Sequence, residues 1–193
     1  MKHEDISLRT KKALSAALKQ QMEQKPLRKI TVNDIVTACG VNRKTFYYHF
    51  TDVYDLLKWT LEQEAIEVVK QFDLRTSWHD ATLFIINYVE ENAHILNCAY
   101  DSMGRDELKR FFCNDFYEVV DGMIDRCAAE NHCTVPESFR TFLREVSTEA
   151  LAGVLVNWFR QKHTPEEKEQ TIRYLSLVMF SSLPAILKEA NKL

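Results

Sequence analysis

The stretch from Ile30 to Leu57 constrains the fold of this chain most strongly, because it places two short helical patterns on either side of one glycine. The first pattern begins at Thr31, whose hydroxyl can cap a backbone N–H three residues on while Asp34 reaches back. Gly40 follows where a left-handed residue ends a helix at least cost. The apolar residues of this first helix recur at helical spacing, at Val32, Ile35, Val36 and Cys39.

The second pattern predicts a helix with one apolar face and one polar face. Asn42 can cap this helix, and Phe46 and Phe50 lie four residues apart and therefore share a face. The stretch as a whole predicts a helix-turn-helix. An exposed arc with cations, hydroxyls, phenols and an imidazole suits the groove of a polyanion. From composition alone, a solvated helix on a helical bundle remains the alternative.

A resemblance to a known family supports the first interpretation. The run T-V-x-D-I-V-x-x-x-G-V-N-R-K-T-F-Y-Y-H-F-x-D-x-x-D-L-L resembles the DNA-binding domain of the TetR/AcrR family of bacterial transcription regulators. The match covers about the first quarter of the chain, and its T-F-Y-Y-H-F segment is the most specific part. Two departures stand out: Val53 occupies the position of a usual lysine, and Lys25-Pro26-Leu27 replaces a common glycine. One phosphate contact of the family is therefore expected to be missing or to come from Lys58.

The resemblance implies a role for each residue of the motif. Arg43, Lys44 and Tyr47 are expected nearest the base edges, with Asn33 reaching in from the preceding helix. Arg43 is the predicted specificity residue, because arginine can donate two parallel hydrogen bonds to guanine. For His49, stacking on Tyr48 or filling an interdomain seam is an equal alternative. The predicted DNA-binding residues are Thr31, Asn33, Asn42, Arg43, Lys44, Thr45, Tyr47, Tyr48 and His49, of which Thr31, Thr45, Tyr48 and His49 are expected to hold phosphates.

Composition predicts an all-α protein with two parts of opposite charge. Only four Gly and four Pro occur in 193 residues, which favours long helices over the many tight turns of a β sandwich. Residues 1–58 contain 11 Lys or Arg and 6 Asp or Glu, a net charge of +5, whereas residues 59–193 carry 14 and 22, a net charge of −8. We therefore expect a three-helix DNA-binding head over residues 1–51 and a helical-bundle regulatory and dimerisation body over residues 52–193.

Hydrophobic periodicity divides the chain into further helices. Leu14, Ala17, Leu18 and Met22 are expected to face the core of the head, with Arg9, Lys11, Lys12 and Lys19 facing away. Gly153 within a helix permits close helix approach, which favours a homodimer through the helices at about 137–162 and 165–190. Two heads about 34 Å apart would read a near-palindromic operator in double-stranded DNA. The expected helices are Ser7 to Gln24, Asp52 to about Phe72, Trp78 to about Ala99, Asp106 to Cys127, Pro136 to about His163, and one from Thr164 with a kink at Pro184.

Several classes of protein are disfavoured by what the sequence lacks. No export signal and no apolar run of 18 residues occurs, so a cytoplasmic protein without membrane segments is expected. The five cysteines are odd in number and lack CxxC spacing, which argues against disulfides and zinc and favours buried thiols. His132 beside Cys133 matches no standard metal site. No catalytic or cofactor motif occurs, so neither an enzyme nor a cofactor is expected.

The effector of such a regulator is the least constrained part of the prediction. An aromatic pocket in the body is expected among Trp78, Phe84, Tyr88, Tyr100, Phe112, Phe116 and Trp158, although aromatics at helical spacing are more often core. The favoured interpretation is a repressor released by a small-molecule effector. The pattern K-I-T-V-N-D-I with N-R-K-T-F-Y is also similar to a TetR-like branch with activators of dihydroxyacetone-kinase operons, which implies a protein partner instead. An interaction protein with weak DNA affinity, and a helical enzyme or carrier, are the remaining alternatives.

Overall fold

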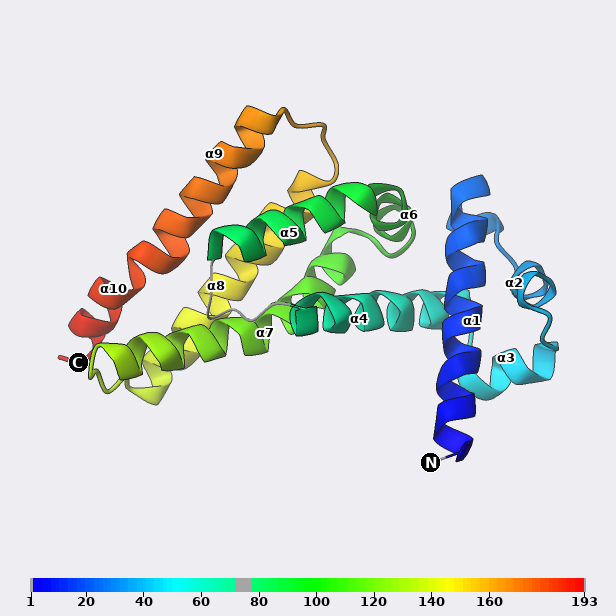
Figure 1. The fold of residues 1–193 in the computed structure, drawn as a ribbon, viewed down its shortest axis with the longest axis horizontal. Coiled ribbons are helices and arrows are strands. Elements are labelled where there is room, and N and C mark those ends of the chain that lie inside the picture. The colour runs from blue at the N-terminus through cyan, green and yellow to red at the C-terminus, as the bar shows by residue number, and fades with distance from the viewer. Residues whose placement is uncertain (1, 72–77, 193) are drawn as a thin grey trace. The chain divides into compact units, whose positions relative to one another are not determined.

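The computed structural model describes the backbone of residues 2–71 and 78–192, and the side chains in these ranges except those of residues 2–4, 65–71, 78 and 81. Helices joined by short turns account for these ranges, and no strand occurs in them, which confirms the predicted all-α fold (Figure 1). None of the helices described is long and apolar enough to cross a membrane. The elements are α1 (Lys2–Gln24), the 3₁₀ turn η1 (Leu27–Lys29), α2 (Val32–Cys39), α3 (Arg43–His49), α4 (Val53–Gln71), α5 (Trp78–Glu91), α6 (Ala93–Met103), α7 (Arg105–Glu130), α8 (Glu137–Trp158), α9 (Pro165–Ser176), the π-helical turn η2 (Leu177–Ser181) and α10 (Leu183–Ala190).

The chain forms two compact units that interleave along the sequence. The first unit comprises Met1–Gln71 and Asn92–Gly104, so that α6 belongs with α1 to α4. The second unit comprises Phe72–Glu91 and Arg105–Leu193. These units do not test the predicted functional boundary between the DNA-binding head, residues 1–51, and the regulatory body, residues 52–193. That boundary stays a prediction.

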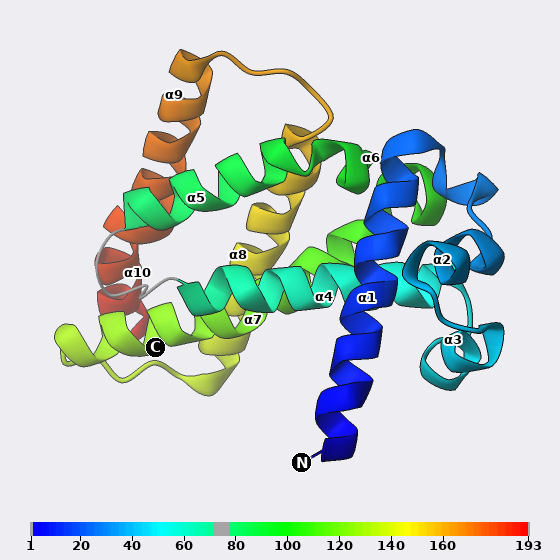
Figure 2. The same ribbon diagram turned by 45° about the vertical axis from the view of Figure 1, so that its right-hand side comes forward.

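The core of the first unit is built around α1, which contacts α2, α4 and α6 (Figures 1 and 2). The residues of α1 that were predicted to face inward are all buried, with Leu14 and Leu18 at 0% exposure. Helix α6 adds a third set of apolar side chains to this unit. The other buried apolar residues of α2 to α4 and α6 are Ile35, Val36, Phe46, Val53, Leu56, Leu57, Leu61, Ile95, Leu96 and Ala99.

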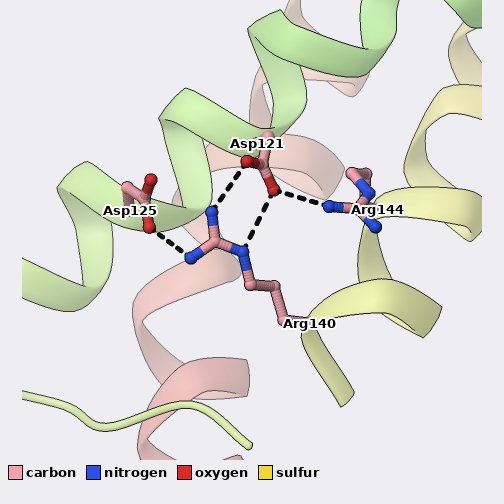
Figure 3. A network of polar contacts seen from close by, with 4 residues as sticks. All are labelled: Asp121, Asp125, Arg140 and Arg144. Atoms are coloured by element: carbon pink, nitrogen blue, oxygen red, sulfur yellow. Dashed lines mark hydrogen bonds and ion pairs between the residues drawn. The ribbon is translucent and has the colours of Figure 1, made fainter. Parts of the chain in front are cut away.

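The second unit rests on the pairing of α7 with α8, which an ion-pair network reinforces (Figure 3). The Arg140 guanidinium donates to both oxygens of Asp121, at 3.1 and 2.7 Å, and to Asp125 at 2.5 Å. Arg144 donates to Asp121 at 3.0 Å and lies 4.2 Å from the Tyr117 ring centroid. Hydrogen bonds from Arg140, followed by those from Arg144, hold the pKa of Asp121 below its ordinary value. The network therefore fixes the register of α7 against α8 in this unit.

Apolar packing joins the end of the chain to α7. Val120 and Ile124 of α7 form a buried cluster with Leu183 and Leu187 of α10. Phe116, one of the aromatic residues expected in an effector pocket, packs against this cluster. The backbone N–H of Thr134 also donates to the Asn191 side chain at 2.7 Å. These contacts place α10 against the turn between α7 and α8.

Two of the predicted helices are wrong in extent. The single helix expected from Trp78 to Ala99 is two, because the backbone leaves helical geometry at Asn92 (φ −101°, ψ 13°). The apolar residues before this break are buried in the second unit, and those after it are buried in the first unit. They therefore do not form one continuous apolar face. The first helix begins at Lys2 instead of Ser7.

The kink expected at Pro184 is a π-helical turn before the proline. Proline donates no backbone hydrogen bond, and its ring crowds the preceding turn. The helix accommodates this ring by widening to π-helical geometry before Pro184. The Ser182 N–H donates to Leu177 O, five residues back, at 3.2 Å, and α10 starts at Leu183 with the proline in its first turn. On α8, the apolar residues Phe142 and Val146 are exposed, at 58% and 49%. The inner face of α8 is formed instead by residues such as Ala152 and Val156.

Gly40 and Gly122 allow the effect of backbone conformation on stability to be measured without a clash from an added side chain. A Cβ added to Gly40 or to Gly122 would meet no atom within 4 Å, but Gly40 ends α2 at φ +70° while Gly122 lies inside α7. We predict that Gly40→Ala lowers the free energy of unfolding by about 1 kcal/mol or more, because L residues are strained in the left-handed region. Gly122→Ala should raise it by up to about 1 kcal/mol through helix propensity. Urea denaturation at one protein concentration measures both, and equal effects would contradict the argument.

Candidate nucleic-acid interface

The first predicted cap of the motif is confirmed at Thr31. The Asp34 N–H donates to Thr31 Oγ1 at 3.2 Å, and the Thr31 N–H donates to Asp34 Oδ2 at 2.8 Å. Lys25, in the segment that departs from the family pattern, forms an ion pair with Asp34 at 2.8 Å. Hydrogen bonds, first from Lys25 and then from Thr31, lower the pKa of Asp34 to about 2. The capping box therefore keeps its charge and holds the start of α2 in place.

Helix α3 is capped and anchored as its sequence predicts. The Asn42 side-chain oxygen accepts from the Thr45 N–H at 2.8 Å and from the Thr45 hydroxyl at 3.2 Å. Phe46 is fully buried and Phe50 is 4% exposed, with ring centroids 6.0 Å apart. Because these two residues face inward, the side chains between them face outward.

An exposed arginine and an exposed tyrosine form a pair at the start of α3. Arg43 Nη2 donates to the Tyr47 hydroxyl oxygen at 3.2 Å, and the guanidinium carbon lies 5.8 Å from the Tyr47 ring centroid. Tyr47 is 51% exposed, and Lys44 next to Arg43 is exposed as well. Arg43 and Tyr47 are one helical turn apart, so their contact limits the rotamers of the arginine side chain while its guanidinium stays exposed to solvent.

His49 lies at the end of α3 in a different environment. Its imidazole is half-buried, 4.9 Å from the Tyr48 ring centroid in an edge-on arrangement. Burial, and secondly the charge of Lys11, lower the pKa of His49 below its ordinary value of 6.5. The Tyr48 ring is therefore in contact with His49, but edge-on and not stacked as the alternative expected. The effect of Lys11 on His49 was not expected from the sequence.

The structure brings the predicted DNA-binding residues together in one segment of the first unit. Thr45 and His49 are half-buried, and the others are exposed. Val53 is buried at 8% exposure and Lys58 is exposed, and the phosphate contact expected to be missing or to come from Lys58 stays a prediction. The exposed members are Thr31, Asn33, Asn42, Arg43, Lys44, Tyr47 and Tyr48. A capped helix with this arc can present donors to phosphates and base edges.

The aromatic residues predicted to line an effector pocket do not share one unit. Tyr100 lies on α6 in the first unit, whereas the described side chains Phe84, Tyr88, Phe112, Phe116 and Trp158 belong to the second. The side chain of Trp78 lies outside the described residues. Trp158 is 6% exposed, donates to Glu90 Oε1 at 3.1 Å and stacks on His163 at 3.6 Å between ring centroids. At least Trp158 and Phe116 therefore serve packing, and the pocket stays a prediction.

The cysteines are half-buried free thiols, less buried than expected. Burial is the largest cause that raises the pKa of Cys98 and of Cys127, and it raises that of Cys113 to about 11. Among the described residues, no group of three or more His, Cys, Asp or Glu is placed to hold a metal ion. The thiols of Cys98, Cys113 and Cys127 are thus poorly disposed to ionise near neutral pH.

Two protein-family models match the chain. Residues 14–58 match the model described as bacterial regulatory proteins of the tetR family, and residues 76–181 match one described as a transcriptional regulator C-terminal region. The first match contains α2 and α3, and the second covers more than half of the chain.

Two characterised relatives are similar to this chain. One is the HTH-type dhaKLM operon transcriptional activator DhaS of Lactococcus lactis subsp. lactis (strain IL1403), 29% identical over 86 residues. That match covers 45% of this chain and 46% of the relative, so it spans about half the length of each. The solved structure of a dihydroxyacetone kinase operon activator DhaS is similar with a TM-score of 0.66 at 19% identity, covering 94% of this chain and 97% of that one. The structural likeness establishes a common fold.

The half-buried histidine makes stability depend on pH. Because the pKa of His49 in the folded state lies below 6.5, the unfolded chain binds more protons as the pH falls through this window. We predict that the folded protein loses stability below about pH 6.5 and that His49→Gln reduces this loss. Thermal unfolding between pH 7.5 and 5 measures the effect, with His94→Gln, an exposed histidine of the same unit, as control. Parallel pH profiles for wild type and His49→Gln would contradict it.

Proposed function

This chain belongs to the TetR family of bacterial regulatory proteins, and from that premise we propose that it binds an operator in double-stranded DNA through residues 31–49. The observation that supports this most is the two-sided character of α3. Phe46 and Phe50 anchor one side in the core, and the other side exposes Arg43, Lys44 and Tyr47. A regulator of this kind acts where the chromosome lies, so we place it in the cytoplasm.

In the proposed complex, each residue has a role that its surroundings support. Arg43 reads a guanine, with Tyr47 restricting its guanidinium, and Lys44 and Asn33 lie near the same base edges. Tyr48 and His49 bind phosphates, and Thr45 does so by turning its hydroxyl away from Asn42 Oδ1, to which it donates in the free protein. Thr31 and Asn42 lie beside the DNA chiefly as caps, because the oxygens of both side chains are engaged by backbone N–H groups. The functional division is a DNA-binding head over residues 1–51 and a regulatory body over 52–193.

A second copy of the chain is the proposed partner of α8 and α9. Apolar side chains of the second unit are exposed on α8, at Phe142 and Val146, and on α9 and η2, at Tyr174, Leu177 and Val178, with exposures between 49% and 64%. Gly153 lies seven residues after Val146 and so on the same side of α8. A Cβ there would meet only the Lys109 side chain, at 3.9 Å, so packing within the chain does not require this glycine. We propose a homodimer through residues 137–162 and 165–190.

The sign of regulation has two candidates. Repression relieved by a small-molecule effector in the body is the first. Activation with a protein partner is the second, and it is favoured by the relatives, both of which are named as operon activators. Both candidates use the same head and differ in what the body binds.

Selection of duplexes from a random DNA pool tests the proposed function directly. We predict that the wild-type protein enriches a near-palindrome with half-sites about one helical turn apart. Arg43→Ala should lose selectivity at one base pair of each half-site and weaken operator binding by about 1–3 kcal/mol. Thr45→Ala should keep the same motif but weaken all sequences alike, because phosphate contacts carry no base information.

The outcomes of this selection separate the alternatives. A flat pool with wild-type protein would favour the interaction protein with weak DNA affinity. Equal losses on operator and random duplexes for both variants would overturn the division of roles between Arg43 and Thr45.

Charge introduced into the proposed dimer surface should separate the copies. We predict that Val146→Glu and Leu177→Glu each shift the protein from dimer to monomer in sedimentation velocity, because a carboxylate buried at an apolar interface has no partner. Ile6→Glu is the matched control, since Ile6 is 63% exposed and Leu177 is 61% exposed, but Ile6 belongs to the first unit. A wild-type monomer, or a dimer indifferent to both variants, would refute the proposed surface.

A further inference from the structure

Lys11 is held at the junction of α3 and α4 by two aromatic rings. Its Nζ lies 5.8 Å from the centroid of Phe50 and 5.8 Å from that of Trp59, and the two rings are themselves 5.8 Å apart. The sequence pattern predicted that Lys11, like Arg9, Lys12 and Lys19, faces away from the core. The structure corrects this for Lys11 and Lys19, which are half-buried, whereas Arg9 and Lys12 are exposed. The two rings therefore restrain the ammonium of Lys11. This is unusual, because the flexible stem of a lysine normally leaves its ammonium free to move.

The restrained ammonium and His49, the last residue of α3, both lie near the ring of Phe50. Lys11 Nζ lies 5.8 Å from the Phe50 ring centroid, and the imidazole centroid lies 6.3 Å from it. The positive charge of Lys11 is also a cause, after burial, of the lowered pKa of His49. Tyr48, 72% exposed, has its ring 4.9 Å from that of His49. The C-terminal end of α3 thus gathers hydrogen-bond donors and a cation that come from two helices.

No carboxylate among the described residues forms an ion pair with Lys11, in contrast to two other lysines of the same unit. Lys19 is paired with Glu64 at 2.5 Å, and Lys25 with Asp34 at 2.8 Å. A cation next to an imidazole is mutually unfavourable when the imidazole is protonated, and an anion that contacts both would offset this repulsion. Attraction of the ammonium to the C-terminal end of α3 is the structural alternative.

We propose that Lys11 and His49 together bind one phosphate of the DNA backbone, at the C-terminal end of α3. This inference rests on the proposed function and adds a contact from α1, outside residues 31–49. Lys11 supplies the charge, and His49 supplies a ring N–H as a neutral donor. The site fixes the position of α3 along the duplex without reading a base, so it acts equally on every sequence.

The salt dependence of DNA binding tests this site. Lys11→Met keeps the apolar stem against the rings and removes the charge, and Lys12→Met removes one charge from the next residue of α1. Fluorescence anisotropy with the duplex selected by the wild type, between 50 and 300 mM salt, gives the slope of log Kobs against log salt. We expect the slope of Lys11→Met to fall by about 0.9, corresponding to about eight-fold weaker binding at 0.1 M salt, on operator and random duplexes alike. Lys12→Met should match the wild type, and Lys11→Arg should retain the slope.

A double-mutant cycle tests the pairing of the two residues. If Lys11 and His49 share one phosphate, Lys11→Met combined with His49→Gln should lose several-fold less affinity than the product of the single losses. Additive losses would overturn the shared site.

The remaining outcomes separate this inference from the function on which it rests. An unchanged slope for Lys11→Met with a lowered unfolding temperature would mean that Lys11 only stabilises the α3–α4 junction. Equal slopes for Lys11→Met and Lys12→Met would show a diffuse charge effect and would also overturn the site. Binding of the wild type to no duplex at any salt concentration would refute the proposed function itself, and this inference with it.

Discussion

Burial of Phe46 and Phe50 beneath α3 is the interaction on which every exposed residue of this helix depends. A helix of seven residues is unstable in water by itself, because nucleation costs more than its few hydrogen bonds return. Complete burial of one phenylalanine contributes about 1.5–3 kcal/mol, and the Asn42 cap adds about 1 kcal/mol. The same two rings fix the rotation of α3 about its axis. A displacement of either ring would therefore move Arg43 and Tyr47 as well as weaken the fold.

The recognition helix α3 is supported by more of the chain than the fifty or so residues of the expected DNA-binding head. Small domains bury too little of their surface to be very stable. Here α4 contributes Leu56 and Leu57, and α6 contributes Ile95 and Leu96, to the unit that contains the helix-turn-helix. The segments before and after α6 both belong to the second unit, so the support of the recognition helix is covalently continuous with that unit at both ends of α6.

Local features of this fold follow from the sequence, and features that need distant partners do not. The capping box at Thr31 and the left-handed Gly40 depend on residues within four positions, and both were predicted. The break at Asn92 was missed, because its two flanking stripes are each regular and differ only in which unit buries them. Lys11 was misplaced for the same reason, since its neighbours Phe50 and Trp59 come from other elements of the chain. The exposed face of α8 could not be recognised either, because its residues are as apolar as those of the buried face.

The proposed dimer explains why apolar residues of α8, α9 and η2 are exposed in the single chain. If α8 and α9 pair with their copies, the pairing sets the distance between two α3 helices, and DNA tolerates only distances near one helical turn. An effector acts on such a protein only through its different affinities for the binding and non-binding distances. A repressor and an activator therefore need no difference in α3. An effector or partner changes only the fraction of the protein in the DNA-binding state, so the residues of α3 do not determine the sign of regulation.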